Sequence, residues 1–251
     1  MTVSESIAKT RAELKNKTPK EKWSYFWEYY TWHVLGALLV IVLLIQGVVS
    51  FSSHKQTVLS GSLLNSFLIQ NEEAYQEALF DHAGLDPKKD EVLFQTNIQL
   101  TNALSSANSE SFQVLHASVA AGRLDFITGD IMPFQKCAYS RSYLFADLRK
   151  HLPADTLAQL EDRLYYVDGA ILYEDVDPFS DESAAEIEYP DPHDPESMAD
   201  PIPVGIEISS CANFMQTYYS QNSSMYIGIV GNAPHLEQTL QFIDYLLADN
   251  G

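Results

Sequence analysis

The feature that most constrains this chain is an uncharged run of eighteen residues from Val34 to Phe51, VLGALLVIVLLIQGVVSF. Its one strongly polar side chain is Gln46. A helix rises about 1.5 Å per residue and needs about 20 mostly apolar residues to cross a hydrocarbon core about 30 Å thick. The run therefore predicts a transmembrane helix. It divides the chain into a cytoplasmic tail (1–22), an aromatic belt with the transmembrane helix (23–51) and an exported domain (52–251).

A cleaved secretory signal is the alternative interpretation of this run, with Val48-Val49-Ser50 as the cleavage site. Signal peptides have an apolar core of about 7–15 residues, which is shorter than the run found here, and the leader ahead of the run is long. No cysteine follows the run, so a lipid-anchored start is not indicated either. We therefore expect an uncleaved signal anchor.

The charges on the two sides of the run predict its orientation. Residues 1–33 have a net charge of +2, whereas the rest of the chain has nine basic and thirty acidic side chains. An excess of Lys and Arg beside a transmembrane helix marks the cytoplasmic side. We expect a single-pass cell-membrane protein with a cytoplasmic N-terminus and an acidic extracytoplasmic domain. That acidity argues against binding nucleic acid.

Aromatic residues are concentrated just before the apolar run, and among them are Trp23, Trp27, Tyr30 and Trp32. Trp and Tyr are enriched at the headgroup level of membranes, so these residues predict an interfacial belt in contact with the lipid bilayer. A surface for a membrane protein partner is the alternative interpretation of the same belt.

The exported part alternates short apolar runs with longer helical patterns, which indicates an α/β domain with a mostly parallel sheet. The expected strands are 57–65, 91–100, 124–128, 203–209 and 225–230, and the expected helices are 71–83, 109–121, 131–138, 153–163, 211–219 and 234–247. Residues 164–174 predict a hairpin that turns at Asp168-Gly169. The acidic segment 174–200 has no Lys or Arg and predicts a disordered, solvated loop.

The chain has two cysteines, Cys137 and Cys211. Outside the cell they could form a disulfide, whereas two buried free thiols are the other interpretation. Their spacing leaves both open.

Several phrases together resemble extracellular solute-binding proteins of ABC transporters. They are LDFITGDIMPFQKCAYSRSYLFADLRKHL at 124–152, LYYVDGAILY at 164–173, the strand at 203–209, and YIGIV at 226–230 with the helix after it. The resemblance implies a periplasmic-binding-protein-like lobe with three layers. A second lobe would need about 100 further residues, and only 210–224 occupy its place. We therefore expect a single, truncated lobe behind one transmembrane helix.

The resemblance also implies which residues would face a ligand at the carboxyl ends of the strands. These residues are Asn65, Ser66, Gly129, Asp130 and Glu207. Each also has an ordinary structural interpretation. Asp130 would cap a helix, Gly129 would form a turn, and Glu207 would face solvent from a strand.

Catalytic and metal-binding motifs are absent from the sequence. The seven histidines occur singly, and no HExxH motif, nucleophile elbow, Walker loop or dinucleotide fingerprint is present. Residues 191–196 (DPHDPE) lack the ligand pattern of a calcium loop. We expect no cofactor, and a non-catalytic domain that binds a partner protein or small solute at the membrane face. The alternatives are a tethered substrate receptor of an ABC-type transporter and an enzyme that uses Asp130 and Glu207.

Overall fold

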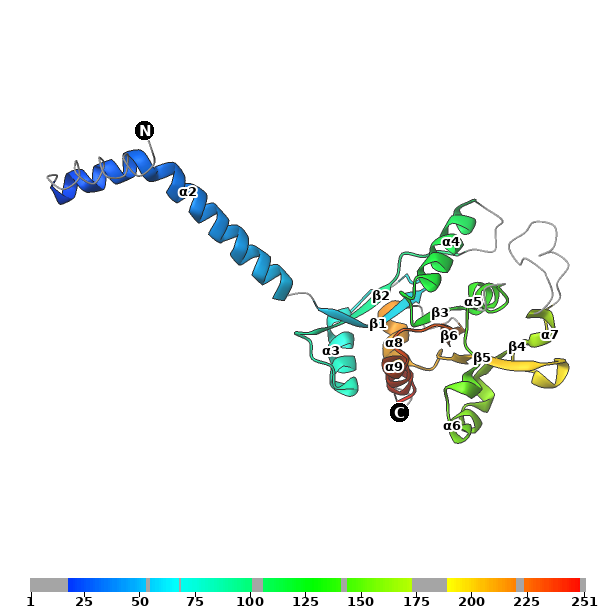
Figure 1. Cartoon of the computed structure of the whole chain (residues 1–251). Helices are drawn as coiled ribbons and strands as arrows, with labels where there is room; N and C mark the ends of the chain where they lie inside the picture. Colours follow the sequence, from blue (N-terminus) through cyan, green and yellow to red (C-terminus); the bar gives the residue numbers. More distant parts are fainter. Residues whose placement is uncertain are drawn as a thin grey trace. The chain divides into compact units, whose positions relative to one another are not determined.

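The computed structural model describes residues 18–52, 55–67, 69–100, 106–140, 144–172, 189–219 and 224–248. The chain divides into two compact units, 1–54 and 55–251 (Figure 1).

The first unit contains the long helix α2 (Pro19–Ser52). Its start is a capping box, which the order Thr18-Pro19-Lys20-Glu21 predicts: a hydroxyl residue at the N-cap, Pro at the first helical position and Glu at the third. The Thr18 backbone N–H and hydroxyl donate to the Glu21 carboxylate at 2.8 Å, and the Glu21 N–H donates back to the Thr18 hydroxyl. In the part of the chain that the structure describes, no helix reaches the length and apolarity of a membrane span.

The second unit is built on a six-stranded sheet with the order β2-β1-β3-β6-β5-β4. The strands are β1 (Gln56–Leu63), β2 (Asp90–Gln95), β3 (Phe126–Asp130), β4 (Leu164–Asp168), β5 (Pro201–Glu207) and β6 (Met225–Ile229). β1 pairs in parallel with β2 and β3, but β6 is antiparallel to both β3 and β5, and β4 is antiparallel to β5. The α/β class is confirmed. The expected mostly parallel sheet is wrong, because β6 returns between β3 and β5 in the opposite direction.

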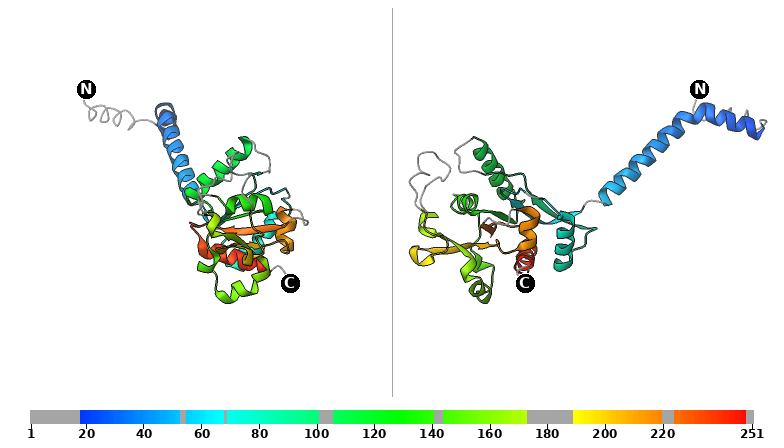
Figure 2. Two further views of the ribbon diagram at one scale, coloured as in Figure 1. Left: turned by 90° about the vertical axis from the view of Figure 1, so that its right-hand side faces the viewer. Right: turned by 180° about the vertical axis from the view of Figure 1, so that it is seen from behind.

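Helices cover both faces of the sheet, so this unit has three layers (Figure 2). Apolar side chains of α3 (Glu72–Ala83), α8 (Ala212–Tyr218) and α9 (Leu236–Ala248) share one buried cluster with Phe126 of β3. Those of α4 (Ser106–Ala120) and α5 (Ile131–Ala138) share a second cluster with the next residue, Ile127. Neighbouring strand residues point to opposite faces, which accounts for the two clusters.

The two cysteines lie in different clusters, Cys211 in the first and Cys137 in the second. Both are buried free thiols. The sheet lies between them, and the structure does not join them in a disulfide. Burial raises the pKa of the Cys137 thiol to about 12.

The hairpin expected at Asp168-Gly169 is not formed. β4 ends at Asp168, the short helix α7 (Gly169–Leu172) follows, and β4 pairs with β5 instead. The Asp168 carboxylate accepts from the Ala170 N–H at 3.0 Å, so the Asp-Gly pair begins a helix rather than a two-residue turn.

Part of the expected acidic loop is ordered. Residues 173–188 lie outside the described residues, but within 189–200 Met198 is buried and Tyr189 packs on Tyr139 at 4.5 Å between ring centroids. The Tyr166 N–H also donates to the Pro192 carbonyl at 2.9 Å. The prediction of a solvated loop overlooked these apolar side chains within an acidic composition.

Candidate ligand-binding site

The sheet has two ends that differ in their side chains. We call the end where β1, β3 and β5 finish the Asp130 end, and the end where β4 and β6 finish the Asp168 end. The register places Asp130 opposite Met225 and Glu207 opposite Tyr226, at the start of β6. The five residues implied by the resemblance therefore gather at the Asp130 end.

Asn65 and Ser66 already have partners within the domain. The Asn65 side chain exchanges two hydrogen bonds with the backbone of Leu100, both 2.8 Å long. The Ser66 hydroxyl donates to the Tyr218 carbonyl at 2.7 Å. These bonds fasten the end of β1 to the segment after β2 and to α8, which is a structural role for both residues.

Asp130 lies just before α5, as expected for a cap, but its side chain makes no capping hydrogen bond. Its Oδ1 atom is buried without a hydrogen-bond partner in the described part of the chain. Burial raises the pKa of Asp130, and the neighbouring Asn65 amide opposes that rise. Gly129, just before it, is buried in β3. Asp130 is thus the least satisfied carboxylate at this end.

Glu207 is half-buried at the end of β5. Its Oε1 atom accepts from the Ser209 hydroxyl at 2.8 Å, and its backbone carbonyl accepts from Arg163 Nε and Nη2. None of the five residues at the Asp130 end lines the main pocket of the second unit.

The main pocket lies toward the Asp168 end, where β5 and β6 separate. These strands pair through Ile206–Ile227 and Glu207–Tyr226 near the other end. Beyond that, the segment 144–146 runs along β6. The Ala146 N–H donates to the Ile229 carbonyl at 2.8 Å, and the Gly231 N–H donates to the Leu144 carbonyl at 2.9 Å. We call 144–146 the wedge segment, because it takes the place beside β6 that β5 leaves.

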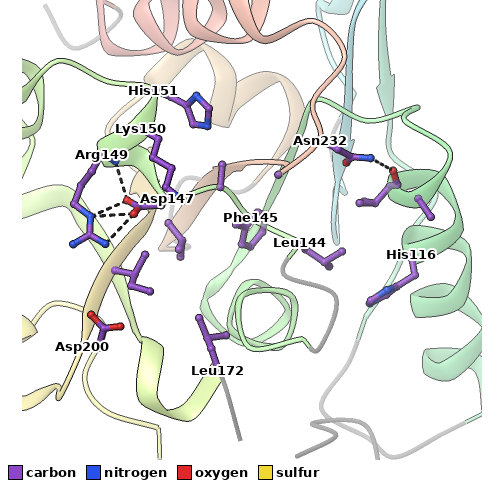
Figure 3. A pocket seen from close by; sticks show the side chains of 16 residues that line it. His116, Leu144, Phe145, Asp147, Arg149, Lys150, His151, Leu172, Asp200 and Asn232 are labelled. Atoms are coloured by element: carbon purple, nitrogen blue, oxygen red, sulfur yellow. Dashed lines mark hydrogen bonds and ion pairs between the residues drawn. The ribbon is translucent and has the colours of Figure 1, made fainter. Parts of the chain in front are cut away.

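The pocket has a volume of about 680 Å³ and is lined by five parts of the second unit (Figure 3). They are α4, the wedge segment with the short helix η1 (Leu148–Lys150) after it, α7, the start of β5 with Asp200 before it, and the two residues 231–232 that follow β6. Its apolar surface comes from Val119, Leu144, Phe145, Leu172, Ile202 and Val204. Its polar surface comes from His116, Asp147, Arg149, Lys150, His151, Asp200 and Asn232.

One ion pair organises the polar surface. Arg149 Nε and Nη2 both lie 2.9 Å from the Asp147 carboxylate, and Asp147 also caps η1 by accepting from the Arg149 N–H. Burial raises the pKa of Asp147, but hydrogen bonds and charge from Arg149 outweigh this and lower it. Hydrogen bonding to Asp147 raises the pKa of Arg149 in turn. The pair is therefore charged and fixed in place.

Asp168 fixes the backbone of two segments beside the pocket by accepting hydrogen bonds from them. Its buried carboxylate accepts from the N–H groups of Ala170, Ala199 and Asp200, each at 3.0 Å. These hydrogen bonds, with that of Ala199 foremost, lower the pKa of Asp168. They hold Asp200 where it lines the pocket.

Sequence reasoning placed the candidate ligand contacts at the Asp130 end and missed this pocket. A signal was present in Asp147-Leu148-Arg149-Lys150, which puts two adjacent basic residues into a strongly acidic domain. The separation of β5 from β6 has no comparable signal, because the wedge segment is not contiguous with either strand.

Among the described residues, no group of three His, Cys, Asp or Glu side chains is arranged to hold a metal ion. The chain matches no protein-family model, no curated protein and no solved structure. The geometry of the pocket is therefore the main guide to function.

Proposed function

We propose that this chain is a membrane-anchored extracytoplasmic binding protein whose second unit holds a small solute in the pocket beside the wedge segment. The observation that supports this is the pocket itself. Its volume of about 680 Å³ lies within the range of roughly 300–1,000 Å³ that is usual for small-molecule sites. Its lining combines a buried apolar wall with polar and charged side chains that could orient a solute.

The side chains in the pocket favour binding over catalysis. Of the lining residues that the structure describes, none carries a hydroxyl or thiol that could act as a nucleophile. The Asp147 carboxylate is occupied by Arg149 and so is not poised to accept a proton. We therefore propose that the domain binds its solute without converting it.

For the first unit we propose a single membrane-spanning anchor. The sequence run from Val34 to Phe51 supports it, and every described residue from Leu38 to Ile45 exposes its apolar side chain. Trp23, Trp27, Tyr30 and Trp32 are exposed as well. Such side chains on all sides of one helix are stable in lipid rather than in water. The charge bias indicates a cytoplasmic N-terminus.

Binding of an extracytoplasmic partner protein is a second candidate, and one observation favours it. Phe67 and Ile69, which follow β1 at the Asp130 end, are 75% and 55% exposed. Exposed apolar side chains that lie together on one surface are typical of interaction sites. A permease that accepts solute from the tethered domain would be one such partner, as the resemblance to solute-binding proteins implies.

The solute proposal is tested by filling the pocket from an exposed helix position. Ala120 lines the pocket from α4, so Ala120→Trp should occupy the site with little effect on the core. The matched control is Ala117→Trp, an exposed position of the same helix that does not line the pocket. We expect a solute library to raise the melting temperature of the full chain and of Ala117→Trp, but not of Ala120→Trp.

Asp130→Ala distinguishes the two ends of the sheet in the same assay. Under the proposal this variant keeps the solute-induced shift. Loss of the shift in Asp130→Ala together with its retention in Ala120→Trp would contradict the pocket as the site.

The anchor and its orientation are tested by cysteine labelling in intact cells. Because Cys137 and Cys211 are buried, new cysteines at exposed Lys20 and Ser210 can be probed without removing them. We expect a membrane-impermeant maleimide to label Ser210→Cys and not Lys20→Cys. The opposite pattern would contradict the proposed orientation.

A further inference from the structure

The basic residues of the second unit are few, and two of them meet at the pocket. Residues 55–251 have nine Lys and Arg side chains against thirty acidic ones. Arg149 and Lys150 are adjacent on η1, and both line the pocket (Figure 3). Asp147 and Asp200 also line the pocket, so its charged side chains balance, whereas the second unit as a whole is strongly acidic.

The two cations differ in what they already bind. Three hydrogen bonds of 2.9–3.1 Å tie the Arg149 guanidinium to Asp147, and Nη1 lies 3.4 Å from the Pro201 carbonyl. Within the described part of the chain, the Lys150 ammonium forms no ion pair or hydrogen bond. Lys150 is therefore the cation in the pocket that is available to a ligand.

The apolar surface lies beside this cation. Leu144, Phe145 and Val204 are buried or nearly so, yet they contribute to the pocket wall. Next to Lys150 stands the half-buried His151 ring, a second group able to donate a hydrogen bond. A complementary solute would have a compact apolar body and an acceptor group at one end.

We propose that the pocket takes a small organic anion, with its carboxylate paired to Lys150 and its apolar body against Leu144, Phe145 and Val204. This inference rests on the proposed solute-binding function and adds the chemical class of the solute. Asp147 and Asp200 both interact with the Arg149 charge. The Lys150 charge also acts on Asp147, but among the described residues the two form no ion pair, so the Lys150 ammonium can still pair with a ligand.

Three matched probes test the class: benzoate, benzamide and benzylamine share one ring and differ in charge. Saturation-transfer NMR on the full chain in lipid nanodiscs measures binding, and empty nanodiscs correct for partition into lipid. We expect benzoate to bind at least about fivefold more tightly than benzamide, because hydrogen bonds to charged groups are the stronger ones. Benzylamine should bind most weakly.

Lys150→Ala should remove most of the preference for benzoate, and Lys150→Arg should restore part of it. The matched control is Lys88→Ala, an exposed lysine that does not line the pocket, which should bind benzoate as the wild type does. Equal binding of benzoate and benzamide that Ala120→Trp abolishes would overturn the anionic class while leaving the solute function in place. Absence of binding by any probe, with no melting shift from the library, would overturn both.

Discussion

The two ends of the sheet differ in how many hydrogen bonds their buried carboxylates accept. At the Asp168 end, Asp168 accepts three backbone N–H groups. Asp125, just before β3 at this same end, is fully buried and also has three donors. At the Asp130 end, one oxygen of Asp130 is buried without a partner among the described residues. A buried carboxylate whose oxygens all accept hydrogen bonds stabilises the segments that donate to it. A buried carboxylate oxygen without a donor destabilises the fold.

The two ends therefore differ in structural role. At the Asp168 end, hydrogen bonds to buried carboxylates fix segments that shape the pocket, including the Asp200 backbone, whose N–H donates to Asp168. The other end has exposed apolar side chains and the unsatisfied carboxylate. Three substitutions test the contrast, each followed by urea unfolding of the full chain. All three tryptophans precede the second unit, so the signal should be the near-ultraviolet circular dichroism of its buried tyrosines.

The largest effect is expected from Asp125→Ala. This change leaves the Ser60 N–H, the His235 N–H and the His235 ring without their acceptor in a buried place. We expect the free energy of unfolding to fall by about 3–5 kcal/mol. Asp125→Asn keeps one acceptor oxygen and should lose less. If Asp125→Ala lowered the free energy of unfolding by less than about 1 kcal/mol, the hydrogen bonds to this carboxylate would not be important for the stability of the domain.

Asp168→Asn should have an intermediate effect that depends on pH. The variant can keep at most part of the three N–H contacts, so we expect a loss of about 1–3 kcal/mol at pH 7. The folded protein lowers the pKa of Asp168, so its carboxylate stabilises the fold above the ordinary value of 3.8. That stabilisation is lost as the pH falls through the lowered pKa. The gap between wild type and variant should therefore narrow in acid, and a constant gap would contradict the assignment.

Asp130→Asn should have the smallest effect, and of the opposite sign. Because the folded protein raises the pKa of Asp130, its ionised form destabilises the fold, and wild-type stability falls as the pH rises from 3.8 through the raised pKa. We expect the variant to be more stable at pH 7 by up to about 1 kcal/mol, a gain limited by partial exposure to solvent. The gain should vanish below pH 3.8. A destabilised variant at pH 7 would mean that the ionised Asp130 has a favourable partner.

Much of the fold is predictable from local patterns in the sequence. The capping box at Thr18 and Glu21, the helix that follows Asp130 and the strand at 225–230 all occur where expected. In each of these cases neighbouring residues determine the local structure, so spacing and composition suffice.

The errors arise where distant residues decide the structure. The Asp168-Gly169 pair has the composition of a hairpin turn, but its carboxylate binds the N–H groups of Ala199 and Asp200, about thirty residues later. The pocket depends on pairing of the wedge segment along β6, and the paired residues Phe145 and Val230 are more than eighty positions apart in the sequence. Periodicity cannot report such contacts. Local patterns therefore predict most of the helices and strands, whereas for the pocket they offer only the adjacent basic residues Arg149 and Lys150.

Gly228 of β6 allows Phe145 to take its position in the pocket wall. A Cβ atom added to Gly228 of β6 would meet the Phe145 ring at 2.6 Å, closer than atoms can approach. The Phe145 ring, which forms part of the pocket wall, thus packs directly against the backbone of β6 at Gly228, where no side chain intervenes. A single added methyl group at Gly228 would push the ring away from the strand and alter the shape of the cavity. Under the proposed function, the size of the solute would then be set in part by Gly228, which does not line the pocket.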